Sequence, residues 1–237
     1  MSAGTTGALI VFAKDPVPGR VKTRLVPPFT PRQAAEFYAA MLDDVLEASS
    51  RFARVYGLTP ILAIDPPEAV GSIAARVPTD YRVIPQRGAN LAERMAWAVR
   101  DAAAGGANRI LLRGSDSPVL DGEKFGEALR ILDEAALVVC PDLDGGYNMV
   151  GLRRPALGLF DHPMSTRTAL EDTLANAAAL GMTSQLQQPS FDIDIAEDLV
   201  WLARARSGPA HESVTRLCPN ALAYLDTANL WPDAASL

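Results

Sequence analysis

The chain is poor in cysteine, histidine and lysine. Its 237 residues include two cysteines, two histidines and three lysines. Neither a disulfide framework nor a paired C-x-x-C metal site is expected, and Cys140, at the end of an apolar segment, is predicted to be a buried thiol. With only His162 and His211, a histidine-based triad has little support. The G-x-S-x-G and H-E-x-x-H motifs are also absent.

Long hydrophobic runs and a strong positive charge are absent as well. No apolar run approaches the roughly 20 residues that a membrane-spanning helix needs, so no membrane span is expected. Residues 1–7 carry no basic segment of the kind that opens a signal peptide, which makes the cytoplasm the expected location. The net charge of -6 argues against a nucleic-acid partner.

Short apolar segments alternate with longer amphipathic ones along the chain. This pattern predicts a three-layer α/β/α fold with a mostly parallel central sheet. Strands are expected at residues 8–13, 60–64, 81–84, 109–113, 136–140, 147–152 and 183–187. Helices are expected after the capping signal Thr30-Pro31-Arg32-Gln33 and at residues 69–76, 91–104, 122–132 and 168–180.

The best candidate boundary is Ser207-Gly208-Pro209. Residues 1–207 are predicted to form one domain. Residues 208–237 are too few for a second domain, so they are expected to form a tail with one short helix near residues 212–224. This tail is predicted to pack on the main body or on the partner subunit of a homodimer.

A basic loop follows the first strand. Between Lys14 and Arg24 it carries four cations and one anion, although the whole chain is acidic. It begins at the carboxyl end of a buried strand, where open α/β sheets bind ligands. Arg20, Lys22 and Arg24 alternate, so an extended backbone would place them on one side, facing phosphate oxygens. Gly19 would allow close approach of the backbone. The loop matches neither the P-loop nor the dinucleotide fingerprint, and a solvated surface loop is the alternative.

Gly114-Ser115-Asp116-Ser117-Pro118 follows another predicted strand, so it reaches the same edge of the sheet. A carboxylate at this position suits Mg²⁺ or Mn²⁺, which prefer oxygen ligands. We therefore predict that Asp116 binds a metal ion that neutralises a diphosphate. The alternative is an aspartate that caps the following turn.

Two further segments carry candidate residues. In Asp142-Leu-Asp-Gly-Gly-Tyr147, the adjacent glycines permit a tight turn that would present Asp144 and Tyr147 to an acceptor, although an ordinary hairpin turn competes with this interpretation. In Phe191-Asp-Ile-Asp-Ile-Ala-Glu-Asp198, the spacing favours Asp194 as a helix cap with Glu197 three residues later. Asp192 or Asp194 is also a candidate metal ligand.

Several of these segments together resemble one known family. The long string LIVFAKDPVPGRVKTRL, residues 9–25, resembles the opening signature of the DUF2064 family of bacterial GT-A-like proteins, described as nucleotide-diphospho-sugar transferases or glycosyltransferases. Shorter blocks follow in the family's order: Gly114 to Pro118, Asp144 to Tyr147 with Gly151-Leu152, Ser165-Thr166, and Asp192 to Leu199. The chain departs from the family pattern at Leu143, Asn148 and Met164, all on the expected acceptor side.

The resemblance implies a cytoplasmic, metal-dependent transferase with a nucleotide-sugar donor and a small-molecule acceptor. The nucleotide would be bound by Ala13, Lys14, Gly19, Arg20, Lys22, Arg24, Gly114 and Ser115. Mg²⁺ or Mn²⁺ would be held by Asp116 and Asp194. The acceptor pocket would comprise Asp144, Gly145, Gly146 and Tyr147, with Lys22 and Asp144 as catalytic groups.

Two alternatives stay open at this point. Nucleotidyltransferases share the fold, the basic loop and the aspartate, so a chain that couples an NTP to a phosphorylated metabolite and releases pyrophosphate is the second hypothesis. The third is a nucleotide-binding protein that has lost catalysis, which the departures on the acceptor side favour.

Overall fold

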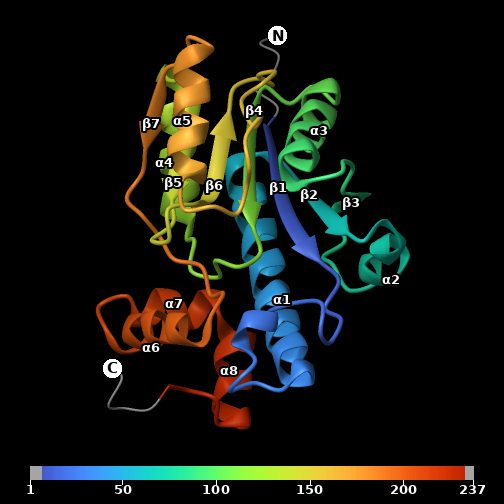
Figure 1. Ribbon diagram of the computed structural model, residues 1–237, viewed down its shortest axis with the longest axis vertical. Coiled ribbons are helices and arrows are strands. Elements are labelled where there is room, and N and C mark those ends of the chain that lie inside the picture. Colours follow the sequence, from blue (N-terminus) through green and yellow to red (C-terminus); the bar gives the residue numbers. More distant parts are fainter. Residues whose placement is uncertain (1–6, 233–237) are drawn as a thin grey trace.

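The computed structural model describes residues 7–232. Residues 1–6, where a signal peptide was not expected, and residues 233–237, at the end of the predicted tail, lie outside the described part. A seven-stranded sheet forms the centre of the molecule, in the order β3-β2-β1-β4-β6-β5-β7 (Figure 1). The strands are β1 (Gly7–Lys14), β2 (Leu58–Asp65), β3 (Arg82–Pro85), β4 (Arg109–Gly114), β5 (Leu137–Pro141), β6 (Tyr147–Leu152) and β7 (Ser184–Leu186).

Helices cover both faces of this sheet, which confirms the predicted three-layer fold (Figure 1). The larger ones are α1 (Pro31–Tyr56) and α4 (Gly122–Glu134) on one face, and α3 (Leu91–Ala104) and α5 (Ala169–Ala179) on the other. Short helices are η1 (Thr23–Leu25), η2 (Pro67–Ala69), α2 (Val70–Ala74) and η3 (Ala196–Asp198). Within the described residues, no helix is long and apolar enough to cross a membrane.

Strand β1 shows why the sheet is covered on both faces. Ile10 and Phe12 belong to the core under α3, whereas Leu9 and Val11 belong to the cores under α4 and α1. Successive side chains of a strand point to opposite faces, so an uninterrupted apolar strand requires a helix layer on each side. The continuous apolar run read from the sequence is therefore a central strand, as expected.

Helix α1 begins where the sequence predicts. Thr30 accepts a hydrogen bond from the backbone N–H of Gln33, and the Gln33 side chain accepts one from the Thr30 backbone. This reciprocal capping box satisfies two otherwise unpaired donors at the helix start. The helix ends at Gly57, whose φ of 65° is the left-handed conformation that glycine adopts readily.

The direction of the strands determines where functional residues gather. β1 pairs in parallel with β2 and with β4, so these three strands end at the same edge. β6 runs antiparallel between β4 and β5. The connection between β5 and β6 therefore returns to the edge at which β1 and β4 end.

The C-terminal part forms three helices beside α1, α6 (Leu199–Ser207), α7 (His211–Leu217) and α8 (Pro219–Ala228) (Figure 1). The single helix expected near residues 212–224 is wrong, because Cys218 leaves the helical conformation and Pro219 opens a second helix. Proline favours a first helical position because it lacks an N–H. The buried Asp44 of α1 accepts hydrogen bonds from the backbone N–H groups of Asn220 and Ala221, which attaches α8 to α1.

Candidate functional site

A cavity of about 250 Å³ lies at the carboxyl ends of β1 and β4. Eight candidate site residues predicted from the sequence line it: Arg24, Gly114, Asp116, Asp144, Gly146, Tyr147, Asp192 and Asp194. These residues come from four segments that are far apart in the chain. The edge at which parallel strands end therefore brings together residues of the predicted metal, nucleotide and acceptor sites.

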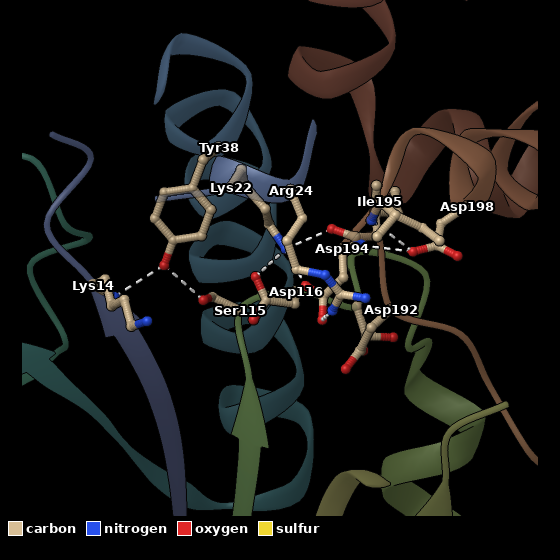
Figure 2. A network of polar contacts seen from close by, with 12 residues as sticks. Lys14, Lys22, Arg24, Tyr38, Ser115, Asp116, Asp192, Asp194, Ile195 and Asp198 are labelled. Atoms are coloured by element: carbon tan, nitrogen blue, oxygen red, sulfur yellow. Dashed lines mark hydrogen bonds and ion pairs between the residues drawn. The ribbon is translucent and has the colours of Figure 1, made fainter. Parts of the chain in front are cut away.

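Lys22 lies between two carboxylates of this edge (Figure 2). Its Nζ forms an ion pair with Asp116 and lies 2.9 Å from Oδ1 of Asp194, and it also donates to the Ile193 carbonyl. The side chain of Lys22 is only 4% exposed. Burial lowers the pKa of Lys22, but the charges of Asp116 and Asp194 outweigh that effect and raise it above its ordinary value. The ammonium group therefore keeps its charge.

The basic loop is not extended, so the expected alignment of three cations on one side is wrong. Lys22 has a left-handed backbone with φ of 46°, and Thr23–Leu25 then form a short 3-10 helix. The buried side chains of Val21 and Leu25 anchor this turn. In consequence Lys22 turns inward, while Arg24 stays 69% exposed with its Nη1 3.9 Å from Asp194. Arg20 and Gly19 are exposed on the surface of the loop.

Tyr38 of α1 joins the ends of the two central strands, which the sequence did not indicate. Its hydroxyl oxygen accepts a hydrogen bond from the Lys14 backbone N–H at 2.9 Å and shares one with Oγ of Ser115 at 2.8 Å (Figure 2). Burial raises the pKa of Tyr38 to about 12. This polar role could not be predicted locally, because it depends on a residue 77 positions away in the chain.

The backbone at Ala13 is occupied by a protein contact. Gln86, after β3, donates from its Nε2 to the carbonyls of Ala13 and Ala63, each at 3.0 Å. The Ala13 side chain is buried. A nucleotide contact at Ala13 therefore stays a prediction. Gln86 joins the ends of β1 and β2, much as Tyr38 joins the ends of β1 and β4.

Arg113 supports the loop that carries Asp116. This arginine is buried, donates from Nε to the Gly114 carbonyl at 3.1 Å, and donates from Nη2 to the Ser117 carbonyl. The Asp116 carbonyl accepts a hydrogen bond from the Ile193 backbone N–H at 2.9 Å. Burial lowers the pKa of Arg113 to about 10. The loop is thus held from both sides, with the Asp116 side chain 39% exposed toward the cavity.

Asp194 is not a helix cap, contrary to the interpretation that its spacing favoured. Its carboxylate pairs with Lys22. The side chain of Asp198, within η3, satisfies the backbone at the start of this helix instead: its Oδ2 accepts hydrogen bonds from the backbone N–H groups of Asp194 and Ile195 at 2.8 and 2.9 Å (Figure 2). The acidic run contains a second carboxylate at the right spacing, which leaves Asp194 available to the site.

The buried Asn148 and the partly buried Asp192 and Asp142 form a polar group next to these ion pairs. Oδ1 of Asp142 accepts hydrogen bonds from the Asp192 backbone N–H at 2.9 Å and from Nδ2 of Asn148 at 3.0 Å. Nδ2 of Asn148 also lies 3.2 Å from Oδ1 of Asp192. Burial, followed by the charges of Asp116 and Asp142, raises the pKa of Asp192 well above its ordinary value. No role was predicted for Asp142 from the sequence, and Asn148 was noticed only as a departure from the family pattern.

This acidic group fits a divalent cation chemically. The carboxylates of Asp116 and Asp194 both pair with one buried ammonium, those of Asp192 and Asp142 lie next to them, and Oδ1 of Asn148 is a buried acceptor with no hydrogen-bond partner among residues 7–232. A buried acceptor left unpaired is costly, so a missing donor or cation is the simplest explanation. The oxygen ligands match Mg²⁺ or Mn²⁺. No group of three or more histidine, cysteine or acidic side chains in residues 7–232 has metal-binding geometry as it stands.

The segment Asp142 to Tyr147 is the hairpin between β5 and β6. Oδ1 of Asp144 accepts a hydrogen bond from the Gly146 backbone N–H at 2.8 Å, and Gly145 has φ of 97°. The hairpin interpretation is therefore confirmed; the turn also lines the cavity, and its role in binding an acceptor stays a prediction. Tyr147 lies behind Asp144, with its hydroxyl 3.3 Å from Oγ1 of Thr173.

Comparisons with known proteins agree with this architecture. A 1.90 Å crystal structure of a protein from Desulfovibrio desulfuricans G20, described as a nucleotide-diphospho-sugar transferase, matches with a TM-score of 0.79 at 25% identity, over 95% of this chain and 99% of that one. The phosphoenolpyruvate guanylyltransferase of Mycolicibacterium smegmatis is 29% identical over 212 residues, 88% of this chain and 90% of that protein. A 4-diphosphocytidyl-2C-methyl-D-erythritol synthase from Anaerococcus prevotii shares the fold at 10% identity and a TM-score of 0.54, over 82% and 96% of the two chains.

The chain is therefore an α/β transferase whose fold is similar to that of a nucleotide-diphospho-sugar transferase, as the sequence predicted. More particularly, residues 48–166 match the family described as "Uncharacterized protein conserved in bacteria (DUF2064)". The chain belongs to this family, which confirms the resemblance found in its motifs.

Proposed function

We propose that this transferase moves a nucleotidyl group from a nucleoside triphosphate to an acceptor that carries its own anionic oxygen, and releases pyrophosphate. The observation that carries the proposal is the buried Lys22 ammonium between Asp116 and Asp194, at the carboxyl ends of β1 and β4. A fixed positive charge at this edge is suited to a phosphate group, and the adjacent carboxylates are suited to its counter-ion. The similarity to a guanylyltransferase makes GTP the donor to test first.

In this proposal, different residues of the basic loop contact different phosphates of the nucleotide. The exposed Arg20 and Arg24 are free to approach the β- and γ-phosphates from solvent. Lys22, held rigidly underneath, is positioned to offset the charge that develops on the α-phosphate. The acceptor oxygen forms a bond to the α-phosphorus, the bond to the bridging oxygen of the β-phosphate breaks, and pyrophosphate leaves with that electron pair.

Asp116 and Asp194 are the proposed metal ligands, with Asp192 and Asn148 behind them. A bound Mg²⁺ or Mn²⁺ supplies neutralisation of the phosphate charge there. Because Lys22 pairs with the same two carboxylates, it also prevents Asp116 and Asp194 from pairing with other groups until a ligand binds.

The proposed class of acceptor rests on the contacts of Asp144. One oxygen of this carboxylate is occupied by the Gly146 N–H of the hairpin, so the side chain is tied to the turn. An acceptor that is already a phosphate or carboxylate anion needs no general base. The cavity beside Asp144, Gly146 and Tyr147 is the proposed place for that anion.

Glycosyl transfer from a nucleotide-diphospho-sugar is the second candidate. The similarity at 25% identity to a protein described as such a transferase supports it. The two reactions differ in the product that leaves, because glycosyl transfer releases a nucleoside diphosphate and nucleotidyl transfer releases pyrophosphate.

The test is a product assay with the purified protein. Each of the four NTPs is incubated with Mg²⁺ or Mn²⁺ and small phosphorylated acids, phosphoenolpyruvate first, and pyrophosphate is measured; parallel reactions with UDP-, GDP- and CDP-sugars are assayed for nucleoside diphosphate. Pyrophosphate release with GTP, reduced at least about 100-fold in Asp116→Asn, is the expected result. Asp121→Asn is the matched control, because Asp121 caps α4 outside the cavity. Nucleotide binding without either product would instead indicate a protein that has lost catalysis.

A further inference from the structure

A second, larger cleft adjoins the cavity at the ends of β1 and β4. It has a volume of about 1050 Å³ and lies between α3 and the segment 155–165, which connects β6 to α5. Three residues line both spaces: Leu91, Met164 and Ser165. The two spaces therefore adjoin at these three residues, so a ligand long enough to pass them would reach from the smaller space into the larger one.

The lining of the cleft is mostly apolar. Val99 and Phe160 form its buried floor, and the cleft also reaches Leu157, which is 84% exposed, and Leu91, which is 39% exposed. Apolar side chains gathered around a concave surface and open to solvent are typical of a ligand site. Polar groups of Arg100, Asp161 and His162 also line the cleft.

Hydrogen-bonding groups run through the wall between the two spaces, from the cleft to the smaller cavity. Ser165 has φ of 60°, a left-handed backbone that a residue with a Cβ adopts only when its surroundings enforce it. Nε2 of His162, in the cleft, lies 2.8 Å from Oγ1 of the buried Thr173. Oγ1 of Thr173 lies 3.3 Å from the hydroxyl of Tyr147, in the smaller cavity. A continuous chain of hydrogen-bonding groups thus fixes the wall that the two spaces share.

We propose that this cleft binds the non-reacting part of the acceptor, and that the acceptor is an anion with an apolar body, a hydrocarbon chain or ring several carbons long. The anionic group would occupy the cavity beside Asp116 and Asp144, and the apolar body would pass Leu91 and Met164 into the cleft. This inference rests on the proposed transferase reaction for the identity of the ligand. The affinity of the cleft for an apolar body is measurable without turnover.

The experiment uses n-alkyl phosphates as probes. The full-length protein with Mg²⁺ is titrated by calorimetry with methyl, butyl and hexyl phosphate, and GTP binding is measured separately. Burial of each methylene contributes about 0.8 kcal/mol, so affinity is expected to rise roughly fourfold per methylene, or about 15-fold from butyl to hexyl. The variant Ala96→Phe is designed to fill the cleft, because Ala96 lines the cleft but not the smaller cavity. Ala104→Phe, at the exposed end of the same helix, is the matched control.

Ala96→Phe is expected to abolish the dependence on chain length, while GTP affinity and the response of Ala104→Phe stay as in the wild type. An equal dependence in Ala96→Phe and wild type overturns the inference, as does a folded protein that binds GTP but no alkyl phosphate. If Ala96→Phe fails to fold by circular dichroism, Ala96→Met, a smaller change, is expected to weaken the dependence. Chain-length dependence without any GTP binding supports the cleft but contradicts the proposed donor, so the two failures are distinguishable.

Discussion

Nζ of Lys22 lies 2.9 Å from Oδ1 of Asp194, 172 residues away in the chain. The loop after β1 is thereby joined to the segment before α6. Both ends of the described fold contribute to a single site, and the first prediction follows from this pair.

Lys22→Met removes the ammonium from between Asp116 and Asp194. Without the competing charge, the two carboxylates are expected to bind Mn²⁺ about tenfold more tightly when no nucleotide is present, because like charges close together favour a cation. GTP affinity is expected to fall at the same time, since the phosphates lose their buried partner. Calorimetry with Mn²⁺ and, separately, with GTP measures the expected gain in metal affinity and the expected loss of nucleotide affinity. Lys124→Met is the control, because Lys124 contacts the Gln188 carbonyl away from the cavity; parallel weakening of both ligands in Lys22→Met would contradict the assignment.

Tyr38→Phe removes the hydroxyl that joins Lys14 to Ser115. A stability loss of about 1–2 kcal/mol is expected, because two buried polar groups lose a partner. Nucleotide affinity is expected to fall severalfold, since the ends of β1 and β4 are no longer held together. Tyr56→Phe is a matched control on the same helix, because the Tyr56 hydroxyl donates to the Gly122 carbonyl outside the cavity. Chemical denaturation and calorimetry separate the two effects, and equal affinity losses in both variants would argue against a specific role for Tyr38.

Gly145→Ala is expected to destabilise the hairpin strongly. Gly145 has φ of 97°, and a Cβ there would collide with the Arg167 carbonyl. Gly181→Ala provides the comparison, because Gly181 also has positive φ, at 67°, but has open space around a Cβ. The left-handed backbone alone costs about 1 kcal/mol, so Gly181→Ala measures that cost and the excess in Gly145→Ala measures the collision. Thermal unfolding of both variants is the measurement; similar losses would mean that the segment at Arg167 yields easily.

Asp44→Asn tests how the tail is attached to α1. Burial raises the pKa of Asp44 to about 6, despite its hydrogen bonds from Asn220 and Ala221. A carboxyl with a raised pKa in the folded state stabilises most below its unfolded pKa, near 3.8, and loses that contribution as the pH rises to about 6. The stability advantage of the wild type over Asp44→Asn is therefore expected to shrink by about 2–3 kcal/mol between pH 4 and pH 7. Denaturant titrations of both proteins at several pH values measure this difference in the free energy of unfolding. A difference that grows as the pH rises would contradict the prediction.

The sequence predicted the elements whose signals are local. The capping residues fix α1, and the amphipathic period fixes α3 at its observed bounds, residues 91–104. The site was predicted only in part, because its geometry depends on distant neighbours. Alternation suggested that Arg20, Lys22 and Arg24 share a side, but a left-handed turn at Lys22 separates them. Spacing suggested that Asp194 caps a helix, but it could not show that the Asp198 side chain would bind the backbone N–H groups at the start of η3 while Lys22 paired with Asp194.

The scarcity of lysine gives the Lys22 ion pairs a practical use. Only Lys14, Lys22 and Lys124 carry side-chain amines, and the Lys22 side chain is 4% exposed between its carboxylates. An acylating reagent reacts with the free amine, so Lys22 should be labelled far more slowly than the exposed Lys14. Any ligand that draws Lys22 away from Asp116 and Asp194 changes that rate. Mass spectrometry of the tryptic region around Lys22 then reports the occupancy of the site, with Lys124, which lies away from the cavity, as the internal standard.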